Sequence, residues 1–354
     1  MRRSWMLAAL AAWLLAATAA AATRATAAAP SSFGVADGGD IQTLSRSDLA
    51  RYLDGVKGAG ARWIRIGIYW AVIQRGGPRS YDWKAFDRVV NAAKRRRLAV
   101  LGVIVYTPSW ARARGMPGAA PPLDLGLYAA FAGRVARHFR ARVRAYEIWN
   151  EPNIAGFWAP GPSPAAYTAM LELAYRAIKR ARPSATVVSA GLSPHASYGA
   201  VDAQHVNPIT FLEQMYANGA RGSMDAVGWH PYNFPFGLAY YNWSAWSQMA
   251  ATAPSARSVM RANGDGGKRV WATEWGAPTG TSATSVTEAG QAALVADALR
   301  RLRALPWAGP SFLYSYRDTG TNAADRVQNF GIVRHDFSRK PAYAAFRNAT
   351  RRRS

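Results

Sequence analysis

The sequence contains no cysteine among its 354 residues. This absence excludes a disulfide framework, a thiol nucleophile and a zinc site built on thiolates. It does not settle the redox compartment, because a chain of this size buries enough apolar surface to fold without a disulfide or a metal.

Acidic residues are scarce, with 20 Asp and Glu against 44 Lys and Arg and a net charge of +24. Such an excess would attract nucleic acid, anionic lipid or an acidic polysaccharide. It is also typical of a biased composition that places arginines on solvated helix faces. The clusters at 95–97, 300–301 and 351–353 close predicted helices, where cations are favourable. No nucleic-acid-binding motif accompanies the charge, so we favour the second interpretation and expect no nucleic-acid partner.

Long hydrophobic runs are missing except at the N-terminus. There, Arg2 and Arg3 precede an apolar run over Trp5–Ala22, and small residues follow. This pattern predicts a signal peptide over residues 1–29 and an extracytoplasmic, secreted protein without a membrane span after cleavage. An uncleaved anchor is the alternative, since the run is just long enough to span a bilayer. The run is mostly alanine and therefore weakly apolar, which favours cleavage.

Residues 30–354 repeat one pattern, in which a short apolar run rich in β-formers precedes a loop and an amphipathic segment. The predicted strands are Phe33–Ala36, Trp63–Ile68, Ala99–Val105, Ala145–Trp149, Thr186–Ala190, Ala226–Trp229, Arg269–Thr273 and Ser311–Tyr316. The predicted helices are Ser47–Gly58, Asp82–Arg97, Tyr128–Arg140, Pro164–Arg182, Pro208–Asn218, Ser244–Asn263 and Glu288–Leu305, with Ser47 and Ser163 as candidate caps.

Strands that alternate with helices in eight repeats predict one domain, a single (β/α)₈ barrel over residues 30–354. A doubly wound sheet is the alternative. It would need a glycine-rich phosphate turn after the first strand, and residues 34–39 do not supply one.

Two glutamates stand where predicted strands end. Glu151 follows the fourth strand and Glu274 follows the seventh. In a barrel, the C-terminal ends of the strands carry the catalytic groups. Cleavage of a glycosidic bond needs two carboxylates, one to protonate the leaving oxygen and one to attack the sugar or stabilise its cation. The pair therefore predicts a glycosidase.

The segments around both glutamates resemble those of clan A retaining glycoside hydrolases. These segments are Trp-Asn-Glu-Pro-Asn at 149–153 and Thr-Glu-Trp-Gly at 273–276. The strand ends Thr-Pro-Ser-Trp at 107–110 and His-Pro-Tyr at 230–232 look most like glycoside hydrolase family 39. Family 5 and related cellulase-like barrels are near alternatives. The tail at 329–346 is also similar to the closing segment of many such barrels.

The resemblance implies catalytic roles for both glutamates. Glu151 would be the general acid/base and Glu274 the nucleophile of a double displacement on a β-type bond. A general acid must be protonated before the reaction, and the aromatic residues Trp149, Phe157 and Trp158 would disfavour its charged form.

Four further polar residues are expected around the substrate. The resemblance places Asn150 on the sugar 2-hydroxyl and Arg65 beside the nucleophile, and it places His230 and Tyr232 against the sugar or the nucleophile. An arginine in an apolar strand also needs a partner on physical grounds. The alternation of side chains leaves open whether Arg65 faces inward.

Aromatic side chains at strand ends are candidates for stacking on sugar rings. Those expected to bind substrate are Trp110, Trp275, Tyr314 and Tyr316, with Tyr69, Trp70, Phe157 and Trp158 as further candidates. Many clan members have a tryptophan at the end of strand eight. Here a tyrosine takes this place, and Arg317 could reach a substrate anion, so the identity of the bound sugar stays open and an acidic glycan is one possible substrate.

No cofactor or metal is expected. His195 and His205 flank Asp202 in one loop, but their spacing fits no standard ligand motif. A non-catalytic cell-surface barrel that binds polysaccharide, a transglycosylase with the same residues and a binder of anionic surfaces remain alternatives. The sugar, the linkage, internal or terminal cleavage and the oligomeric state do not follow from the sequence.

Overall fold

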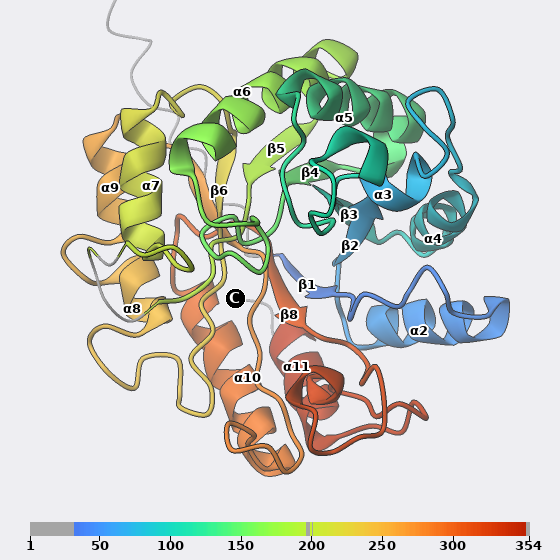
Figure 1. Ribbon diagram of the computed structural model, residues 1–354. Helices are drawn as coiled ribbons and strands as arrows, with labels where there is room; N and C mark the ends of the chain where they lie inside the picture. Colours follow the sequence, from blue (N-terminus) through green and yellow to red (C-terminus); the bar gives the residue numbers. More distant parts are fainter. Residues whose placement is uncertain (1–31, 196–198, 200, 352–354) are drawn as a thin grey trace, which may run out of the picture. The chain divides into compact units, whose positions relative to one another are not determined.

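The structure is a computed structural model that describes residues 32–195, 199 and 201–351 (Figure 1). The predicted signal peptide, residues 1–29, lies outside the described residues. All described residues belong to one compact unit. No helix among them combines the length and the apolar character that crossing a membrane requires.

Eight parallel strands form one sheet in the order β7-β6-β5-β4-β3-β2-β1-β8. Their bounds are β1 Phe33–Ala36, β2 Trp63–Tyr69, β3 Ala99–Val105, β4 Ala145–Ile148, β5 Thr186–Ser189, β6 Ala226–Trp229, β7 Arg269–Ala272 and β8 Ser311–Tyr314. All eight predicted strands are present, and their ends differ from the predicted ones by at most two residues.

Backbone hydrogen bonds join the two outermost strands of this order. Trp275 N donates to Phe312 O at 3.1 Å, Tyr314 N donates to Trp275 O at 2.8 Å, and Gly309 N donates to Val270 O at 2.8 Å. The sheet is thereby closed on itself, which confirms the predicted (β/α)₈ barrel.

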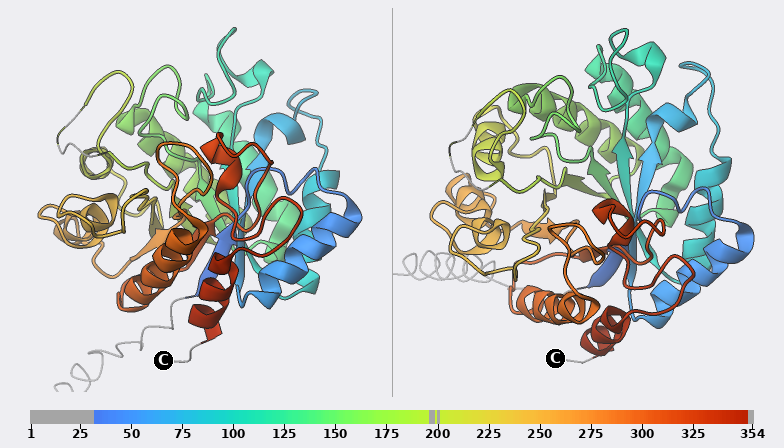
Figure 2. Two further views of the ribbon diagram at one scale, coloured as in Figure 1. Left: turned by 90° about the horizontal axis from the view of Figure 1, so that it is seen from below. Right: turned by 60° about the horizontal axis from the view of Figure 1, so that its bottom comes forward.

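Helices surround the strands (Figure 1, Figure 2). They are α2 Arg46–Gly58, α3 Trp70–Ile73, α4 Lys84–Arg95, α5 Leu125–Phe139, α6 Pro164–Ala181, α7 Pro208–Ala217, α8 Ala245–Ala250, α9 Ala256–Ala262, α10 Glu288–Arg303 and α11 Pro341–Arg351. The C-terminal helix α11 lies beside α10, as both figures show.

Two local predictions about the helices were wrong. The cap of α2 is Ser45 instead of Ser47, because the Ser45 hydroxyl accepts from Asp48 N at 3.0 Å. The single helix expected over Ser244–Asn263 is two helices, α8 and α9. Pro254 separates them, since proline has no N–H to donate and disfavours helical backbone in the residue before it. The predicted cap of α6 is confirmed, since Ser163 accepts from Ala166 N.

An apolar layer fills the inside of the barrel below its C-terminal end. It consists of Ala36, Leu101, Ala145, Val188, Ala226, Trp271 and Phe312, with Trp63 packed against it. Side chains alternate along a strand, so Arg65 shares the inner face of β2 with Trp63. The layer closes the floor of the barrel, and polar side chains lie above it.

Candidate active site

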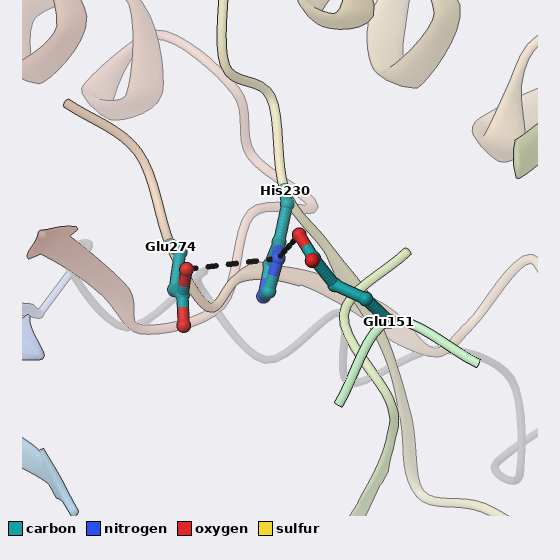
Figure 3. A group of neighbouring side chains, drawn as sticks. All are labelled: Glu151, His230 and Glu274. Atoms are coloured by element: carbon teal, nitrogen blue, oxygen red, sulfur yellow. Dashed lines mark hydrogen bonds and ion pairs between the residues drawn. The ribbon is translucent and has the colours of Figure 1, made fainter. Parts of the chain in front are cut away.

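Glu151 and Glu274 lie on either side of the His230 imidazole at the C-terminal ends of the strands (Figure 3). Nδ1 of His230 is 2.8 Å from Oε1 of Glu151 and 3.8 Å from Oε2 of Glu274. One oxygen of each carboxylate and this nitrogen all lie within 4.8 Å of one another. Folding therefore brings together three residues that follow β4, β6 and β7.

The chain turns sharply after β4 to present Glu151. Trp149 and Glu151 both have left-handed backbones, with φ of 72° and 44°. Trp149 N donates to Ile104 O at 3.0 Å and Glu151 N donates to Gly191 O at 3.1 Å. Such a conformation costs about 1–3 kcal/mol per residue and persists where the surroundings hold it, which is common at functional sites.

Asn153, the last residue of the 149–153 motif, anchors this turn. It is fully buried. Its Nδ2 donates to the carbonyls of Ser193 and Val206 at 2.9 and 3.0 Å, and its Oδ1 accepts from Ser193 N at 2.8 Å. The motif thus joins the loop after β4 to the loop after β5.

Arg65 connects the two sides of the site. Its Nε donates to Glu147 Oε2 at 2.7 Å, its Nη2 donates to Asn150 Oδ1 at 2.8 Å, and its Nη1 is hydrogen-bonded to Glu274 Oε1. Arg65 therefore faces inward, and the expected contact with Glu274 is present. The sequence analysis did not identify Glu147, which is fully buried and whose Oε1 accepts from Gly191 N at 2.9 Å.

The surroundings of Glu274 keep it ionised. Burial acts to raise the pKa of this carboxyl, but His230, Arg65 and the Tyr232 hydroxyl outweigh burial and lower it. The Tyr232 hydroxyl donates to Glu274 Oε2 at 2.8 Å. Burial acts to lower the pKa of His230, but the attraction of the two carboxylates outweighs this opposing effect and raises it. Glu274 is thus suited to act as an anion.

A pocket of about 200 Å³ opens over these groups. Its lining comprises Asp37, Gly38, Gly39, Arg65, Gly67, Tyr69, Val103, Val105, Tyr106, Asn150, Glu151, Phe157, Glu274 and Tyr314. The sequence analysis did not single out Asp37 or Tyr106. Both directly follow a predicted strand, and this position was the available signal.

Three aromatic residues expected to bind substrate do not line this pocket. Trp110 donates its Nε1 to Gln74 O at 2.7 Å, Trp275 is 2% exposed within the seam between β7 and β8, and the Tyr316 ring packs edge-on against Tyr52 of α2. These three rings pack between helices, strands and loops of the fold, which explains why they lie outside the pocket lining.

Other candidates from the sequence also pack elsewhere. Trp70 stacks on Phe131, and Trp158 packs edge-on against Trp149. Arg317 lies over the Phe337 ring at 4.5 Å, and its Nη1 is 3.3 Å from Asp40 Oδ2. Arg317 therefore has an acidic partner within the protein.

The described residues contain one place where three potential metal-ligand atoms meet, and it is formed by Glu151, His230 and Glu274. Both oxygens of Glu274 already accept hydrogen bonds, from Arg65 and Tyr232. A metal ion would have to displace these donors. In the loop after β5, His205 Nδ1 lies 3.8 Å from Asp202, and neither residue lines the pocket.

No protein-family model matches the sequence, and no curated protein matches it. Solved structures share its fold. A family 39 glycoside hydrolase from the gut symbiont Bacteroides cellulosilyticus WH2 has a TM-score of 0.69 and 21% identity, over 91% of this chain and 63% of the other. This chain therefore spans less than two thirds of that protein.

In two further structures, the match with this chain covers a larger share of the other protein. For a monomeric β-xylosidase from Caulobacter crescentus CB15, the TM-score is 0.64 and the identity 21%, over 93% of this chain and 70% of the other. For a GH5_18 protein from Streptomyces cattleya in complex with GlcNAc, the values are 0.67 and 18%, over 92% and 80%. At these identities the likeness is one of fold.

Proposed function

We propose that the protein is a retaining glycosidase that hydrolyses β-type bonds in an oligo- or polysaccharide. One observation carries this proposal: an oxygen of Glu151 and an oxygen of Glu274 lie within 4.8 Å of each other at one pocket. Retaining enzymes hold their two carboxyl groups about 5–5.5 Å apart, and inverting enzymes about 6.5–9.5 Å apart to admit a water molecule. The glycoside hydrolases that share the fold support the same conclusion.

The first step joins the sugar to the protein. Glu274, ionised beside Arg65 and Tyr232, attacks the anomeric carbon while Glu151 gives its proton to the departing oxygen. A covalent bond forms between Glu274 and the sugar, and the glycosidic bond breaks. Because Asn150 Oδ1 accepts from Arg65, its Nδ2 is oriented to donate to the 2-hydroxyl.

The second step releases the sugar. Glu151, now a carboxylate, takes a proton from water, and the resulting oxygen attacks the anomeric carbon and displaces Glu274. The His230 imidazole, 2.8 Å from Glu151, holds that carboxyl in place through both steps. Glu151 is protonated again and Glu274 is a free carboxylate again, so the cycle consumes only the glycoside and water.

Glu274→Gln tests the proposal. An amide cannot attack the sugar, so we expect the variant to lose at least about 10³-fold in kcat on the aryl β-glycoside that the wild type cleaves best among xylosides, glucosides and mannosides. The matched control is Glu172→Gln, which removes an exposed carboxylate paired with Arg176 and should leave kcat unchanged.

The stereochemistry of the first product tests the mechanism separately. Proton NMR during hydrolysis should show the β-anomer before mutarotation. The α-anomer would rule out a double displacement at this pocket, and an unchanged kcat in Glu274→Gln would rule out the nucleophile.

We further propose that the protein acts outside the cytoplasm, on the basis of the signal-peptide pattern over residues 1–29. Mass spectrometry of the protein recovered from its native host checks this proposal. A mature chain that begins between about residues 23 and 29 is expected.

A further inference from the structure

Asp37 is a buried carboxylate at the pocket that the mechanism above does not use. It directly follows β1, where its N–H donates to Arg65 O at 3.0 Å, and it is 8% exposed. Its Oδ2 has no hydrogen-bond partner among the described residues. A buried polar atom without a partner is unfavourable and calls for a ligand.

We propose that Asp37 determines the specificity of this pocket: its carboxylate accepts hydrogen bonds from hydroxyls of a neutral sugar and excludes uronic acids. This inference rests on the proposed glycosidase function and assigns the substrate class of the same pocket.

The position of Asp37 indicates which hydroxyls it would contact. In the strand order, β1 is three strands away from β4, which carries Glu151. Asp37 therefore borders the part of the pocket away from the group that protonates the leaving oxygen. A sugar whose anomeric carbon lies between Glu151 and Glu274 would place its hydroxyls remote from that carbon, those on C3 and C4, toward Asp37.

The charges at the pocket explain why a neutral sugar is favoured. Three acidic residues line it, Asp37, Glu151 and Glu274, and the surroundings of Glu274 keep it ionised. Among the described residues of the lining, Arg65 is the one cation, and its donors already engage Glu147, Glu274 and Asn150. A sugar carboxylate would meet the negative charge of Glu274 and no free cation in the lining, although the whole chain carries +24. His230 is fully buried outside the lining, and its Nδ1 already faces Glu151 and Glu274.

The protonation of Asp37 suits a hydroxyl as ligand. Burial raises the pKa of its carboxyl to about 7, Arg65 opposes this effect, and Asp40 and Glu274 add to it. The other titratable groups that interact with it are the hydroxyls of Tyr52 on α2, Tyr69 on β2 and Tyr314 on β8. Near neutral pH both protonation states are present, and each can accept from a sugar hydroxyl.

Deoxy sugars provide the test. The Asp37→Ala variant and the wild type are compared on the best aryl β-glycoside and on its 3-deoxy and 4-deoxy analogues. For the parent substrate we expect kcat/KM to fall about 10- to 100-fold, the range for a hydrogen bond to a charged group. For the analogue that lacks the contacted hydroxyl, wild type and variant should be nearly equal. Asp54→Asn, an exposed acid paired with Arg96, is the control.

A comparison with an aryl uronide tests whether the pocket excludes uronic acids. The wild type should cleave the neutral glycoside at least tenfold faster than the matched aryl uronide, and Asp37→Asn should narrow that ratio. An equal loss in Asp37→Ala on the parent and on both deoxy analogues, with the unfolding transition unchanged, would overturn the contact. Faster wild-type cleavage of the uronide would overturn the exclusion.

Binding separates a failure of this inference from a failure of the proposed function. If the wild type cleaves no glycoside, calorimetry with cellotetraose, xylotetraose and the C6-carboxylate form of cellotetraose replaces kinetics. Tighter binding of a neutral chain that weakens at least tenfold in Asp37→Ala supports the inference without catalysis. Equal affinity for the neutral and the acidic chains, or no binding to the wild type, would overturn it.

Discussion

Arg65 shows how one residue ties the stability of this protein to its chemistry. Its guanidinium donates to a buried glutamate that has no part in the reaction, Glu147, and to the proposed nucleophile, Glu274. A buried ion pair contributes little net stability over an apolar replacement, because taking both charges out of water offsets their attraction. Removing one partner is costly, because the other charge stays buried alone.

Arg65→Met is therefore expected to lower the free energy of unfolding by about 3–5 kcal/mol. The double variant Arg65→Met/Glu147→Gln should recover much of this loss, since the unpaired charge of Glu147 is gone. It should stay inactive, because Glu274 loses the guanidinium that is hydrogen-bonded to it. Urea unfolding at pH 7 measures the first effect and aryl glycoside hydrolysis the second.

The control for this pair is Arg96→Met, which breaks an exposed pair with Asp54 and should cost at most about 1 kcal/mol. A double variant that is no more stable than Arg65→Met alone would show that the buried charge of Glu147 is not the cause.

Asp37 makes a prediction about stability and pH that is independent of substrate. Its carboxyl has a pKa of about 7 in the folded protein and 3.8 as the ordinary value, so folding favours the protonated form. The associated stability is fully present below pH 3.8 and is lost as the pH rises to about 7. The difference between the two pKa values corresponds to a loss of at most roughly 4 kcal/mol in the free energy of unfolding.

Asp37→Asn cannot ionise, so it escapes this loss. Relative to the wild type, the variant should gain stability between pH 4 and pH 8, as measured by urea unfolding at both values. The comparison between the two pH values cancels the constant effect of replacing the side chain. An equal stability difference at pH 4 and pH 8 would falsify the assigned pKa direction.

Helix ends depend on single side chains that satisfy unpaired backbone N–H groups. In α2 the cap is Ser45, and Ser47, two residues later, is already inside the helix. The sequence offers both serines before the same amphipathic segment, and the first turn can begin at either one. The observed cap lies two residues earlier than predicted, because the Ser45 hydroxyl is the one that accepts from Asp48 N.

These two serines form a matched pair for experiment. Ser45→Ala should lower the free energy of unfolding by about 1 kcal/mol, because the N–H of Asp48 loses its acceptor. Ser47→Ala should change it by a few tenths at most, since alanine is a good helix former. Urea unfolding of both variants checks the assignment, and a larger loss in Ser47→Ala would contradict it.

At the scale of the whole molecule, the barrel closes at the seam between β7 and β8, the two outermost strands of the sheet order. Here Gly276 packs so closely that a Cβ on it would overlap the carbonyl oxygen of Tyr314. That carbonyl belongs to β8, and Trp275 next to Gly276 makes the backbone hydrogen bonds that join the two strands. The seam also carries the pocket, because Glu274 and Tyr314 lie on its two sides.

Gly276→Ala is therefore expected to destabilise the protein by about 1–3 kcal/mol and to lower activity, because it pushes the two sides apart. Gly267→Ala is the control, since a Cβ there meets no atom within 4 Å. Thermal unfolding and aryl glycoside kinetics measure both effects. Equal stability of the two variants would show that the seam tolerates the added methyl group.

The chain as a whole carries a large positive charge, whereas acidic residues outnumber basic ones in the lining of the pocket. Many of the arginines lie in the last turns of helices, such as Arg95 of α4 and Arg300, Arg301 and Arg303 of α10. There they complement the helix dipole. These positions agree with the interpretation that the net charge reflects composition, and the acidic residues of the pocket support our proposal of a neutral glycan.

Much of the architecture followed from local patterns in the chain. Short apolar runs that alternate with amphipathic segments predicted all eight strands and the barrel, because burial imposes a different period on each type of element. The position of Glu151 and Glu274 directly after such runs, with the residues around them, was enough to select both as candidates. Glu151 and Glu274 were expected to lie close together, because parallel strands of one barrel end at the same edge.

The remaining features depend on contacts between segments far apart in the chain, and no local period encodes them. The inward direction of Arg65, the buried partner Glu147 and the position of Asp37 at the pocket all follow from strand register and barrel closure. The same holds for Trp110, Trp275 and Tyr316, whose rings fill space between elements. A side chain's type states what it can bond to, and only the packing of its neighbours determines which partner is within reach.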